Sequence, residues 1–425
     1  MSRPLEGKTV IDLTSALAGP YATLLLAGLG ARVIKVENPQ RGGDSSRNNS
    51  PYVGADGLSV RRRSPDDMSV SMMLRGRGKE SIVLDLKRPE GREVLRDLAR
   101  NADVLVENYS SGVTGRLGID FTALREVNPR LVYTSISGFG ATGDHGDRKA
   151  MDTIIQALSG VMLTAGEPDD PPVRFGLPVG DLVAPLFAVI GTLAAVLEAE
   201  RTGLGQHVDV SMLGALTSLV ACEPFDALES VGFPLRTGAY VPRLAPFGTF
   251  RTKDGWFAIC APTDQFAAGV LTAIGRPDLL GSEDFGTRDA RVANADRLHA
   301  LIAGWAAETT QAEALATLEA NGAPAAAVRT TAEAVRDPQV VARGEVVPLV
   351  HPRFGHFEGL YGSGLPVVFS RSTTDLSTPA PGLGEHTEVV LRDLLGYESE
   401  RITALEEAGV VKRHDRSDLA APLAR

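Results

Sequence analysis

Residues 9–37, TVIDLTSALAGPYATLLLAGLGARVIKVE, decide the fold of this chain. The run at 9–14 is typical of a strand, the apolar run at 18–30 is typical of a helix that begins near Pro20, and 31–37 is typical of a second strand. A strand, a helix and a second strand in this order indicate a βαβ unit. The opening therefore predicts a parallel sheet covered by helices.

A second cycle follows the first. The strand-like runs SIVLDL at 81–86 and DVLVEN at 103–108 flank an amphipathic helix at 89–102, and RLVYTSI at 130–136 adds another strand. Between the cycles, residues 41–68 are rich in Gly, Ser, Asn, Asp and Arg. That composition predicts a long surface loop or lid that is mobile without ligand.

The chain changes character in its middle. GTFRTKDGWFAICAP at 248–262 is typical of a β-hairpin, and Ala-rich helices follow from Asp264 through Leu318. After them the chain is expected to return to the first domain. The expected domains are a large one of residues 1–217 and 330–425 and a smaller inserted one of residues 218–329.

Composition excludes several classes of partner. Of the 425 residues, 43% are hydrophobic and 23% are charged, which is ordinary for a soluble enzyme-sized protein. The formal net charge of −10 argues against nucleic-acid and membrane partners, since both need a concentrated basic surface. The N-terminus lacks the order of a signal peptide, and the apolar run at 182–200, interrupted by Pro185, is interpreted as a buried helix.

Cofactor and metal signals are weak. The first turn lacks the GxGxxG glycines that let a pyrophosphate approach, so Glu37 at the end of the second strand does not indicate a nicotinamide or flavin site. Cys222 and Cys260 lie far apart and the histidines show no ligand spacing, so we expect neither a disulfide nor a bound metal. A cytoplasmic location fits this use of cysteine.

Seven segments in order along nearly the whole chain resemble the family III CoA-transferases, the family of CaiB, BaiF and formyl-CoA transferase. They are AGPYATLLLAGLGARVIKVENPQRGGDSSR (18–47), GRGKESIVLDLKRPEGREVL (76–95), ADVLVENYSSGVTGRLGID (102–120), SISGFGATG (135–143), QALSGVMLTAGEPDDPP (156–172), GDLVAPLFAVIGTLAAVLEAERTGLGQHVDVSM (180–212) and LGEHTEVVLRDLLGY (383–397). The resemblance implies a large Rossmann-like domain made from both chain ends, a small inserted α+β domain and an interlocked homodimer.

The resemblance also implies a catalytic residue. Asp169, in TAGEPDDPP, stands where the family has its nucleophilic aspartate, and Asp170 replaces the glycine usual after it. A carboxylate is ionised at neutral pH and can attack a thioester without a general base. Two alternatives stay open: Asp170 could be the nucleophile, and taken alone the string is typical of an acidic surface turn.

CoA would enter as a substrate, and no permanently bound cofactor is implied. The resemblance places nine residues at the CoA site: the backbone of Ser15, Ala16, Leu17 and Ala18, and the side chains of Asn38, Lys79, Asn108, Arg116 and Ser137. Asn38 and Ser137 occupy positions where formyl-CoA transferases carry an arginine and a lysine. Their phosphate contacts would therefore move, with Arg41 and Arg47 as candidates.

The implied activity is transfer of CoA from an acyl-CoA to a small carboxylic or dicarboxylic acid, with an aspartyl-CoA thioester as intermediate. Arg243 and the run Arg61-Arg62-Arg63 could pair with a second carboxylate, although packing and solvated loop positions are alternatives. The related 2-methylacyl-CoA racemases need a Gly-His-Asp triplet, where this chain has Met151 in place of the histidine and retains Asp152 and Asp181. A non-catalytic CoA-binding protein is the alternative from another class.

Overall fold

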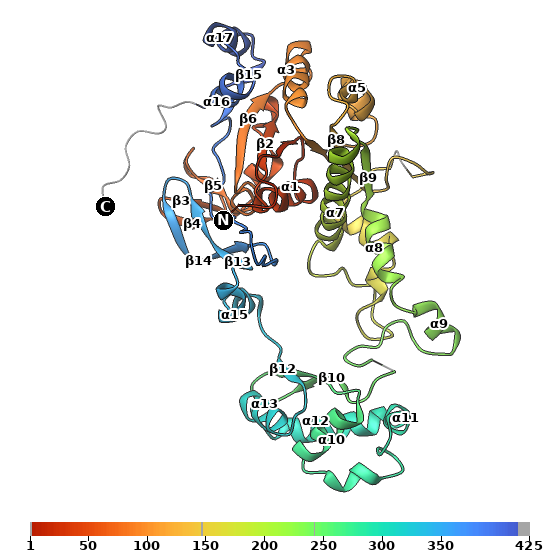
Figure 1. The fold of residues 1–425 in the computed structure, drawn as a ribbon. Helices are drawn as coiled ribbons and strands as arrows, with labels where there is room; N and C mark the ends of the chain where they lie inside the picture. Colours follow the sequence, from red (N-terminus) through yellow and green to blue (C-terminus); the bar gives the residue numbers. More distant parts are fainter. Residues whose placement is uncertain (1, 146–147, 242, 415–425) are drawn as a thin grey trace. The chain divides into compact units, whose positions relative to one another are not determined.

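The computed structural model describes residues 2–145, 148–241 and 243–414, which form two compact units (Figure 1). The first unit contains the described residues of Met1–Ser159, Gly176–Leu219 and Val335–Arg425, and the second contains those of Gly160–Phe175 and Val220–Ala334. The chain thus leaves the first unit and later returns to it. Gly160–Phe175, which the sequence analysis assigned to the large domain, groups with the second unit.

A seven-stranded sheet forms the centre of the first unit, in the order β15-β6-β2-β1-β7-β8-β9. All neighbouring strands pair in parallel except β15, which is antiparallel to β6. The strands are β1 (Thr9–Asp12), β2 (Arg32–Glu37), β6 (Lys79–Leu84), β7 (Val104–Glu107), β8 (Val132–Ser137), β9 (His207–Ser211) and β15 (Val411–Lys412). The six parallel strands have the 3-2-1-4-5-6 order of doubly wound folds, so the predicted parallel sheet is confirmed.

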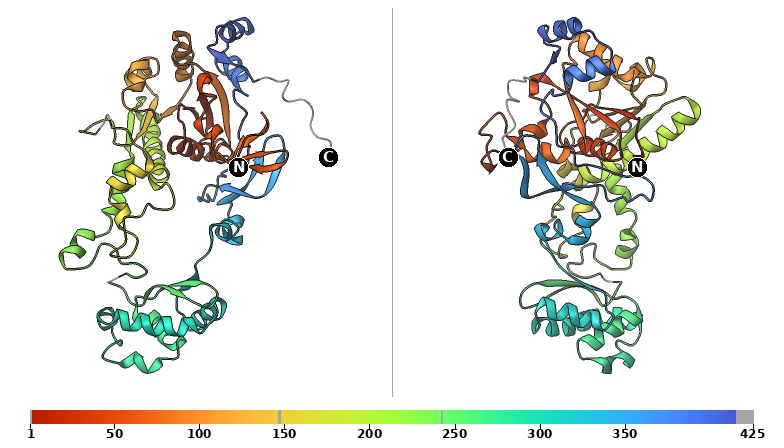
Figure 2. Two further views of the ribbon diagram at one scale, coloured as in Figure 1. Left: turned by 180° about the vertical axis from the view of Figure 1, so that it is seen from behind. Right: turned by 60° about the vertical axis from the view of Figure 1, so that its left-hand side comes forward.

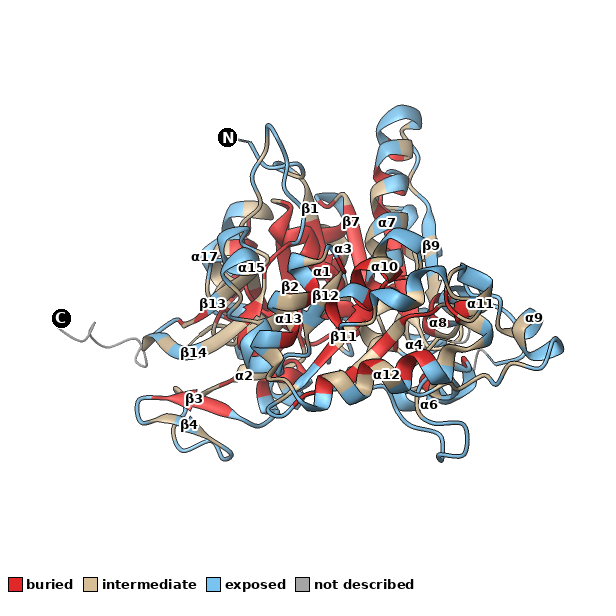
Figure 3. Ribbon diagram, turned by 90° about the horizontal axis from the view of Figure 1, so that it is seen from below, coloured by how far each residue is buried: buried red, intermediate tan, exposed pale blue. Residues whose placement is uncertain are grey.

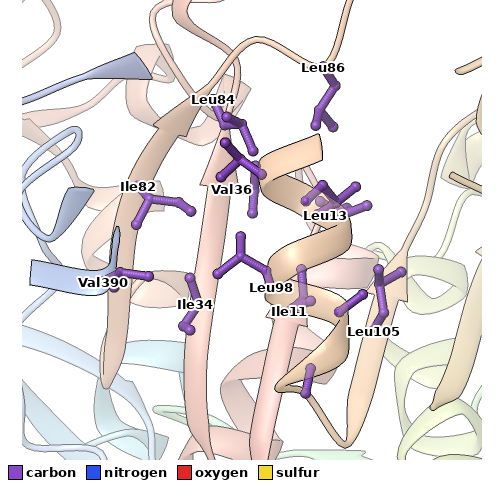
Figure 4. Packing of buried hydrophobic residues seen from close by; sticks show 14 of the residues in the cluster. Ile11, Leu13, Ile34, Val36, Ile82, Leu84, Leu86, Leu98, Leu105 and Val390 are labelled. Atoms are coloured by element: carbon purple, nitrogen blue, oxygen red, sulfur yellow. The ribbon is translucent and has the colours of Figure 1, made fainter. Parts of the chain in front are cut away.

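One face of this sheet packs on α3 (Pro89–Arg100). Side chains alternate along a strand, so Ile11, Ile34 and Leu105 point to the same face, where Leu98 of α3 meets them (Figure 4). The C-terminal elements α16 (Thr387–Val389), the π-helix at Val390–Leu394 and α17 (Ser399–Glu407) belong to the same core. The two ends of the chain therefore share one hydrophobic core (Figure 2).

The opposite face is covered by α1 (Ala18–Gly28) and α7 (Val179–Thr202). The buried residues of α7 are mostly small, among them Ala184, Ala188, Thr192, Ala195 and Ala199. Large apolar side chains on its other side are exposed, namely Leu186, Phe187, Ile190 and Leu197.

The helix interpreted as buried is therefore buried on one side and exposes large apolar side chains on the other. Within the described residues, α7 is long and apolar enough to cross a membrane by length and composition, but core helices of soluble proteins pass the same test.

The region predicted as a mobile loop at 41–68 is folded. It forms a small antiparallel sheet of β3 (Tyr52–Gly54), β4 (Gly57–Ser59) and β5 (Met68–Ser69). Asp44, Arg47 and Val53 are buried there. The prediction failed because the polar residues that suggest solvent, Asp44 and Arg47 above all, have buried partners of opposite charge.

The other elements of the first unit are short, and burial concentrates in the large sheet (Figure 3). They are α2 (Val70–Arg75), α4 (Val113–Leu117), α5 (Phe121–Arg125), α6 (Asp152–Leu158), α8 (Met212–Val220), α15 (Pro338–Ala342), β13 (Val346–His351) and β14 (Gly355–Ser363).

The second unit has its own core around a three-stranded sheet, in which the predicted hairpin is confirmed. Its elements are α9 (Phe225–Ser230), β10 (Phe247–Arg251), β11 (Trp256–Cys260), α10 (Asp264–Ala273), α11 (Arg288–Ala293), α12 (Ala295–Ala307), α13 (Gln311–Ala320), β12 (Ala325–Ala327) and α14 (Thr331–Ala334).

Four charged side chains are buried together near the C-terminal end of β1. The Lys35 ammonium lies 2.6 Å from Asp44 Oδ2 and 3.7 Å from Asp12 Oδ2, and Lys79 Nζ lies 3.0 Å from Asp12 Oδ2. The side chains of all four are at most 1% exposed. Two ammonium groups and two carboxylates balance in charge, which is what allows ions to be buried together.

The protonation of this cluster follows from its geometry. Burial alone would raise the pKa of Asp12, but Lys35 and Lys79 outweigh it and hold the pKa below its usual range. Burial lowers the pKa of Lys79 to about 8, partly offset by Asp12, so its ammonium is still charged at neutral pH. We call Asp12, Lys35, Asp44 and Lys79 the buried charge cluster.

We expect a Lys→Met substitution to lower the free energy of unfolding far more inside the buried charge cluster than at a partly exposed lysine. Lys35→Met would leave two buried carboxylates short of a cation and should lower the free energy of unfolding by about 3–5 kcal/mol. Lys8→Met removes half-exposed pairs with Asp103 and Glu200 and should cost about 0–1 kcal/mol. Urea unfolding of both variants at neutral pH is the measurement. Equal, small losses would mean that the cluster does not stabilise the fold.

Candidate active site

The candidate site lies at the carboxyl edge of the large sheet, between β1 and β7. The strand order reverses direction there, and ligands of open α/β sheets bind outside the carboxyl ends of the strands at such a point. Ser15 follows β1 and Asn108 follows β7. Ser15 N donates to Asn108 Oδ1 and Asn108 Nδ2 donates to Ser15 O, both at 2.9 Å, so the two predicted residues are held together.

Residues of the buried charge cluster hold the turn at residues 15–18 in place through hydrogen bonds. Ala16 N donates to Asp44 Oδ1 at 3.1 Å, and Lys35 Nζ donates to Thr14 O at 2.9 Å. Ala16 has φ 70°, and within the described residues it is the only non-glycine residue with positive φ. Such a backbone conformation persists only where the surroundings enforce it.

This geometry divides the four predicted backbone positions into two pairs. The amides of Ser15 and Ala16 donate within the protein, so these residues shape the turn. Leu17 and Ala18 open α1, where no side chain caps the helix. The first amides of a helix have no partner within it and favour anionic ligands.

Lys79 and Arg47 are not available as phosphate ligands in this structure. Lys79 Nζ donates to Asp12, to Pro20 O at 2.9 Å and to Thr23 Oγ1 at 2.7 Å, which uses all of its donors. The Arg47 guanidinium is buried and donates to both carboxylate oxygens of Glu37 and to a backbone carbonyl. The sequence assigned both to the CoA phosphates; the structure uses both inside the fold.

Three other cations are exposed in loops that follow strands at the same edge. Arg41 follows β2, Lys87 follows β6, and Arg116 lies on α4 after β7. Arg116 and Arg41 were among the sequence candidates. Lys87 was not, because a lysine before Arg88-Pro89 is typical of an exposed helix start.

Asn38 and Ser137 shape turns at this edge. Asn38 Oδ1 accepts from Gln40 N at 2.8 Å, and Ser137 Oγ accepts from Gly140 N at 2.9 Å. Both are short side chains that bond to their own loops. Either residue can therefore contact a ligand only at short range.

Arg75 is a residue that the sequence analysis missed. Its Nη1 donates to Ala16 O at 3.1 Å, and it forms no ion pair within the described part of the chain. Asp181 lies close enough to Arg75 to act on its pKa, and burial followed by repulsion from Asp152 raises the pKa of Asp181 to about 6. Nothing near Arg75 in the sequence signals this position, because its partner is 59 residues away.

The Asp152 carboxylate accepts a hydrogen bond from the backbone at the start of α7. Its Oδ1 accepts from Gly180 N at 2.8 Å and its Oδ2 accepts from Gln156 Nε2 at 2.7 Å. A carboxylate at a helix N-terminus is stabilised by the helix dipole. Asp152 therefore has a structural role, beside an exposed Met151 that cannot transfer a proton.

Asp169 lies in the second unit, in a turn at residues 166–171. Asp170 N donates to Glu167 O and Asp170 Oδ2 accepts from Glu167 N, both at 3.1 Å, so the Asp170 carboxylate closes the turn on itself. Asp169 is exposed and has no hydrogen-bond or ion-pair partner among the described residues. The two adjacent acids thus differ: the Asp170 carboxylate closes the turn, and the Asp169 carboxylate is exposed without a partner there.

Two of the remaining arginine candidates, Arg243 and Arg62, have protein partners for their side chains. Arg243 forms an exposed ion pair with Glu223 at 2.8 Å, beside Pro242, which lies outside the described residues. In the 61–63 run, Arg62 donates to Arg47 O at 2.6 Å and its guanidinium covers the Tyr52 ring. Among the described residues, no group of three or more His, Cys, Asp or Glu side chains could hold a metal ion.

Comparison with known proteins agrees with these features. The family model described as CoA-transferase family III matches residues 5–387. The chain is 35% identical to succinate–glutarate CoA-transferase of Agrobacterium fabrum, over 92% of this chain and 96% of that protein. It is 38% identical to acetyl-CoA:oxalate CoA-transferase of Acetobacter aceti, over 81% of this chain and 85% of that protein.

Solved structures agree as well. A CAIB/BAIF family protein from Brucella suis superposes with a TM-score of 0.80 and 34% identity, covering 93% of this chain and all of that one. The match in sequence and the match in fold extend over the same large share of the chain. The protein belongs to CoA-transferase family III.

Proposed function

We propose that this enzyme transfers CoA from an acyl-CoA to a free small carboxylic acid, with Asp169 as the nucleophile that carries CoA. The observation behind the proposal is the pair of adjacent acids in the 166–171 turn. Asp170 is engaged in closing the turn, while the Asp169 carboxylate is exposed and unpartnered in the described structure. An ionised carboxylate needs no base to attack a thioester.

The reaction then proceeds in balanced steps. The Asp169 carboxylate attacks the acyl carbon of the donor thioester, giving an acyl-aspartyl anhydride and CoA thiolate. The thiolate attacks the aspartyl carbonyl, which forms the aspartyl-CoA thioester and releases the donor acid. The acceptor carboxylate attacks that thioester, which gives an acceptor–aspartyl anhydride and CoA thiolate. The thiolate then attacks the acceptor carbonyl of this anhydride, which forms the new acyl-CoA and releases the Asp169 carboxylate with no net proton transfer.

The same proposal assigns CoA to the carboxyl edge of the large sheet. The amides of Leu17 and Ala18 suit a phosphate or a polarised oxygen at the start of α1. The exposed cations Arg41, Lys87 and Arg116 suit the remaining phosphate charge. Lys79 takes a supporting role in this scheme, since its ammonium fixes Asp12 and the first turn of α1.

Small dicarboxylic acids are the substrates we favour. The relatives are named for succinate and glutarate in one case and for acetyl-CoA and oxalate in the other. Arg75 adds a cation beside the 15–18 turn whose guanidinium geometry suits a second carboxylate. We place the enzyme in the cytoplasm, where the exposed thiols of Cys222 and Cys260 would stay reduced.

Neither alternative function has an observation that favours it. Racemisation needs an acid and a base on opposite faces of the reacting carbon, but Met151 cannot supply a proton and Asp152 is engaged at the start of α7. The relatives at moderate identity are CoA-transferases.

We also infer a homodimer that covers the exposed apolar side of α7. Leu186, Phe187, Ile190 and Leu197 are between 39% and 67% exposed on one helix, which is unusual for a surface that stays in water. A second copy of the chain is the partner that fits the expected interlocked assembly. In a homodimer with two-fold symmetry, the same surface of both copies forms the interface, so no other protein is needed to cover it.

Asp169→Ala should lower the rate of CoA transfer by several orders of magnitude, because the covalent step is lost. The variant should still bind CoA. Asp170→Ala should leave appreciable activity, because it keeps the Asp169 carboxylate and the bond from Asp170 N to Glu167 O, and removes only the side-chain bond that closes the turn. Transfer from succinyl-CoA to glutarate, followed by mass spectrometry, measures both variants. In the wild type, hydroxylamine should convert Asp169 to the hydroxamate only when an acyl-CoA is present. Normal transfer by Asp169→Ala would disprove the assignment.

Ile190→Glu should shift the protein from about twice 44.9 kDa toward the monomer mass in sedimentation, because a charge would have to be buried in the interface. Val60→Glu is the matched control, since Val60 is also exposed, at 77%, but lies away from α7 in sequence. It should remain dimeric. A wild-type monomer, or an Ile190→Glu dimer of unchanged affinity, would contradict the inferred interface.

A further inference from the structure

Arg236 and Gly238 donate hydrogen bonds to backbone carbonyls of the 166–171 turn. Arg236 Nη2 donates to Pro168 O at 3.0 Å and Arg236 Nη1 donates to Pro171 O at 3.1 Å. Gly238 N donates to Gly166 O at 3.0 Å. One guanidinium therefore joins the two carbonyls that flank Asp169-Asp170, although it is 65 residues or more away in sequence.

The turn needs such support because it has little of its own. Residues 167–171 are all exposed, so no hydrophobic burial holds them. The proline nitrogens donate no hydrogen bonds. Inside the turn, the two bonds between Glu167 and Asp170 close a small ring but do not tie it to the rest of the unit.

Arg236 is used only for this purpose within the described residues. It forms no ion pair with an acid there, and both of its side-chain hydrogen bonds go to carbonyls of the turn. An arginine that bridges two carbonyls fixes their distance and direction, because its donors form a rigid planar fork. Its side chain leaves the Asp169 carboxylate unpaired, which keeps that carboxylate reactive.

We propose that Arg236 is a positioning residue for catalysis, which holds the 166–171 turn so that Asp169 is presented in one orientation. The proposal rests on the proposed function, in which Asp169 carries CoA. Arg236 touches neither the substrate nor the reacting atoms in this scheme. Its effect should appear in the rate of the covalent step, because small displacements of a reacting group lower rates steeply.

Arg236→Ala should lower kcat by about 10²-fold, with KM for the acyl-CoA and for the acceptor acid changed by less than about threefold. Arg236→Lys should be intermediate, because an ammonium can reach one carbonyl but not bridge two. The rate of hydroxylamine capture at Asp169 in a single turnover should fall in parallel with kcat. Arg276→Ala, which removes an exposed ion pair with Asp278 in the same unit, is the matched control and should behave as wild type.

The outcomes separate this proposal from the proposed function. Arg236→Ala with wild-type kcat would overturn the positioning role, even if Asp169→Ala were inactive. A loss of kcat accompanied by an equal loss of CoA affinity, or by unfolding at lower temperature in both the Ala and Lys variants, would mean that Arg236 is merely structural. If Asp169→Ala stayed active, the proposed function would fail, and the Arg236 proposal would fail with it.

Discussion

The buried charge cluster is the constraint on which the large unit depends. Asp12 ends β1, Lys35 lies on β2, Lys79 begins β6, and Asp44 comes from the segment after β2. Their ion pairs connect neighbouring strands and enforce the turn that begins α1, including the positive φ of Ala16. A rearrangement that left one of these buried ions without its partner would cost several kcal/mol, so the cluster disfavours alternative arrangements of these strands.

This rigidity at the sheet edge suits a reaction that requires no acid or base from the protein. When a carboxylate attacks a thioester, the protein contributes by holding the two groups in place. We propose that the edge of the large sheet binds CoA through its amides and cations. In the second unit, the Asp170 carboxylate closes a turn, and the Asp169 carboxylate is exposed without a partner among the described residues. As an anion, the proposed nucleophile needs no base, unlike a serine.

The strands and helices of residues 9–37 were predictable because their local periodicity agrees with the final packing. The roles of Lys79 and Arg47 were not, since a lysine or arginine in a polar context is typical of a solvent or ligand contact. Only the partner Asp12, 67 residues before Lys79, reveals that its ammonium is buried. Arg75 and Arg236 escaped prediction for the same reason: both bind backbone carbonyls, which leave no signature in the sequence.

A crystal structure of the enzyme frozen during turnover with an acyl-CoA is the most direct test of Asp169 as the nucleophile. Electron density should be continuous from the Asp169 carboxyl carbon to the CoA sulfur, and the CoA phosphates should lie at the amides of Leu17 and Ala18. An intact acyl-CoA bound at another edge of the sheet, with Asp169 unmodified in crystals that turn over, would contradict this assignment.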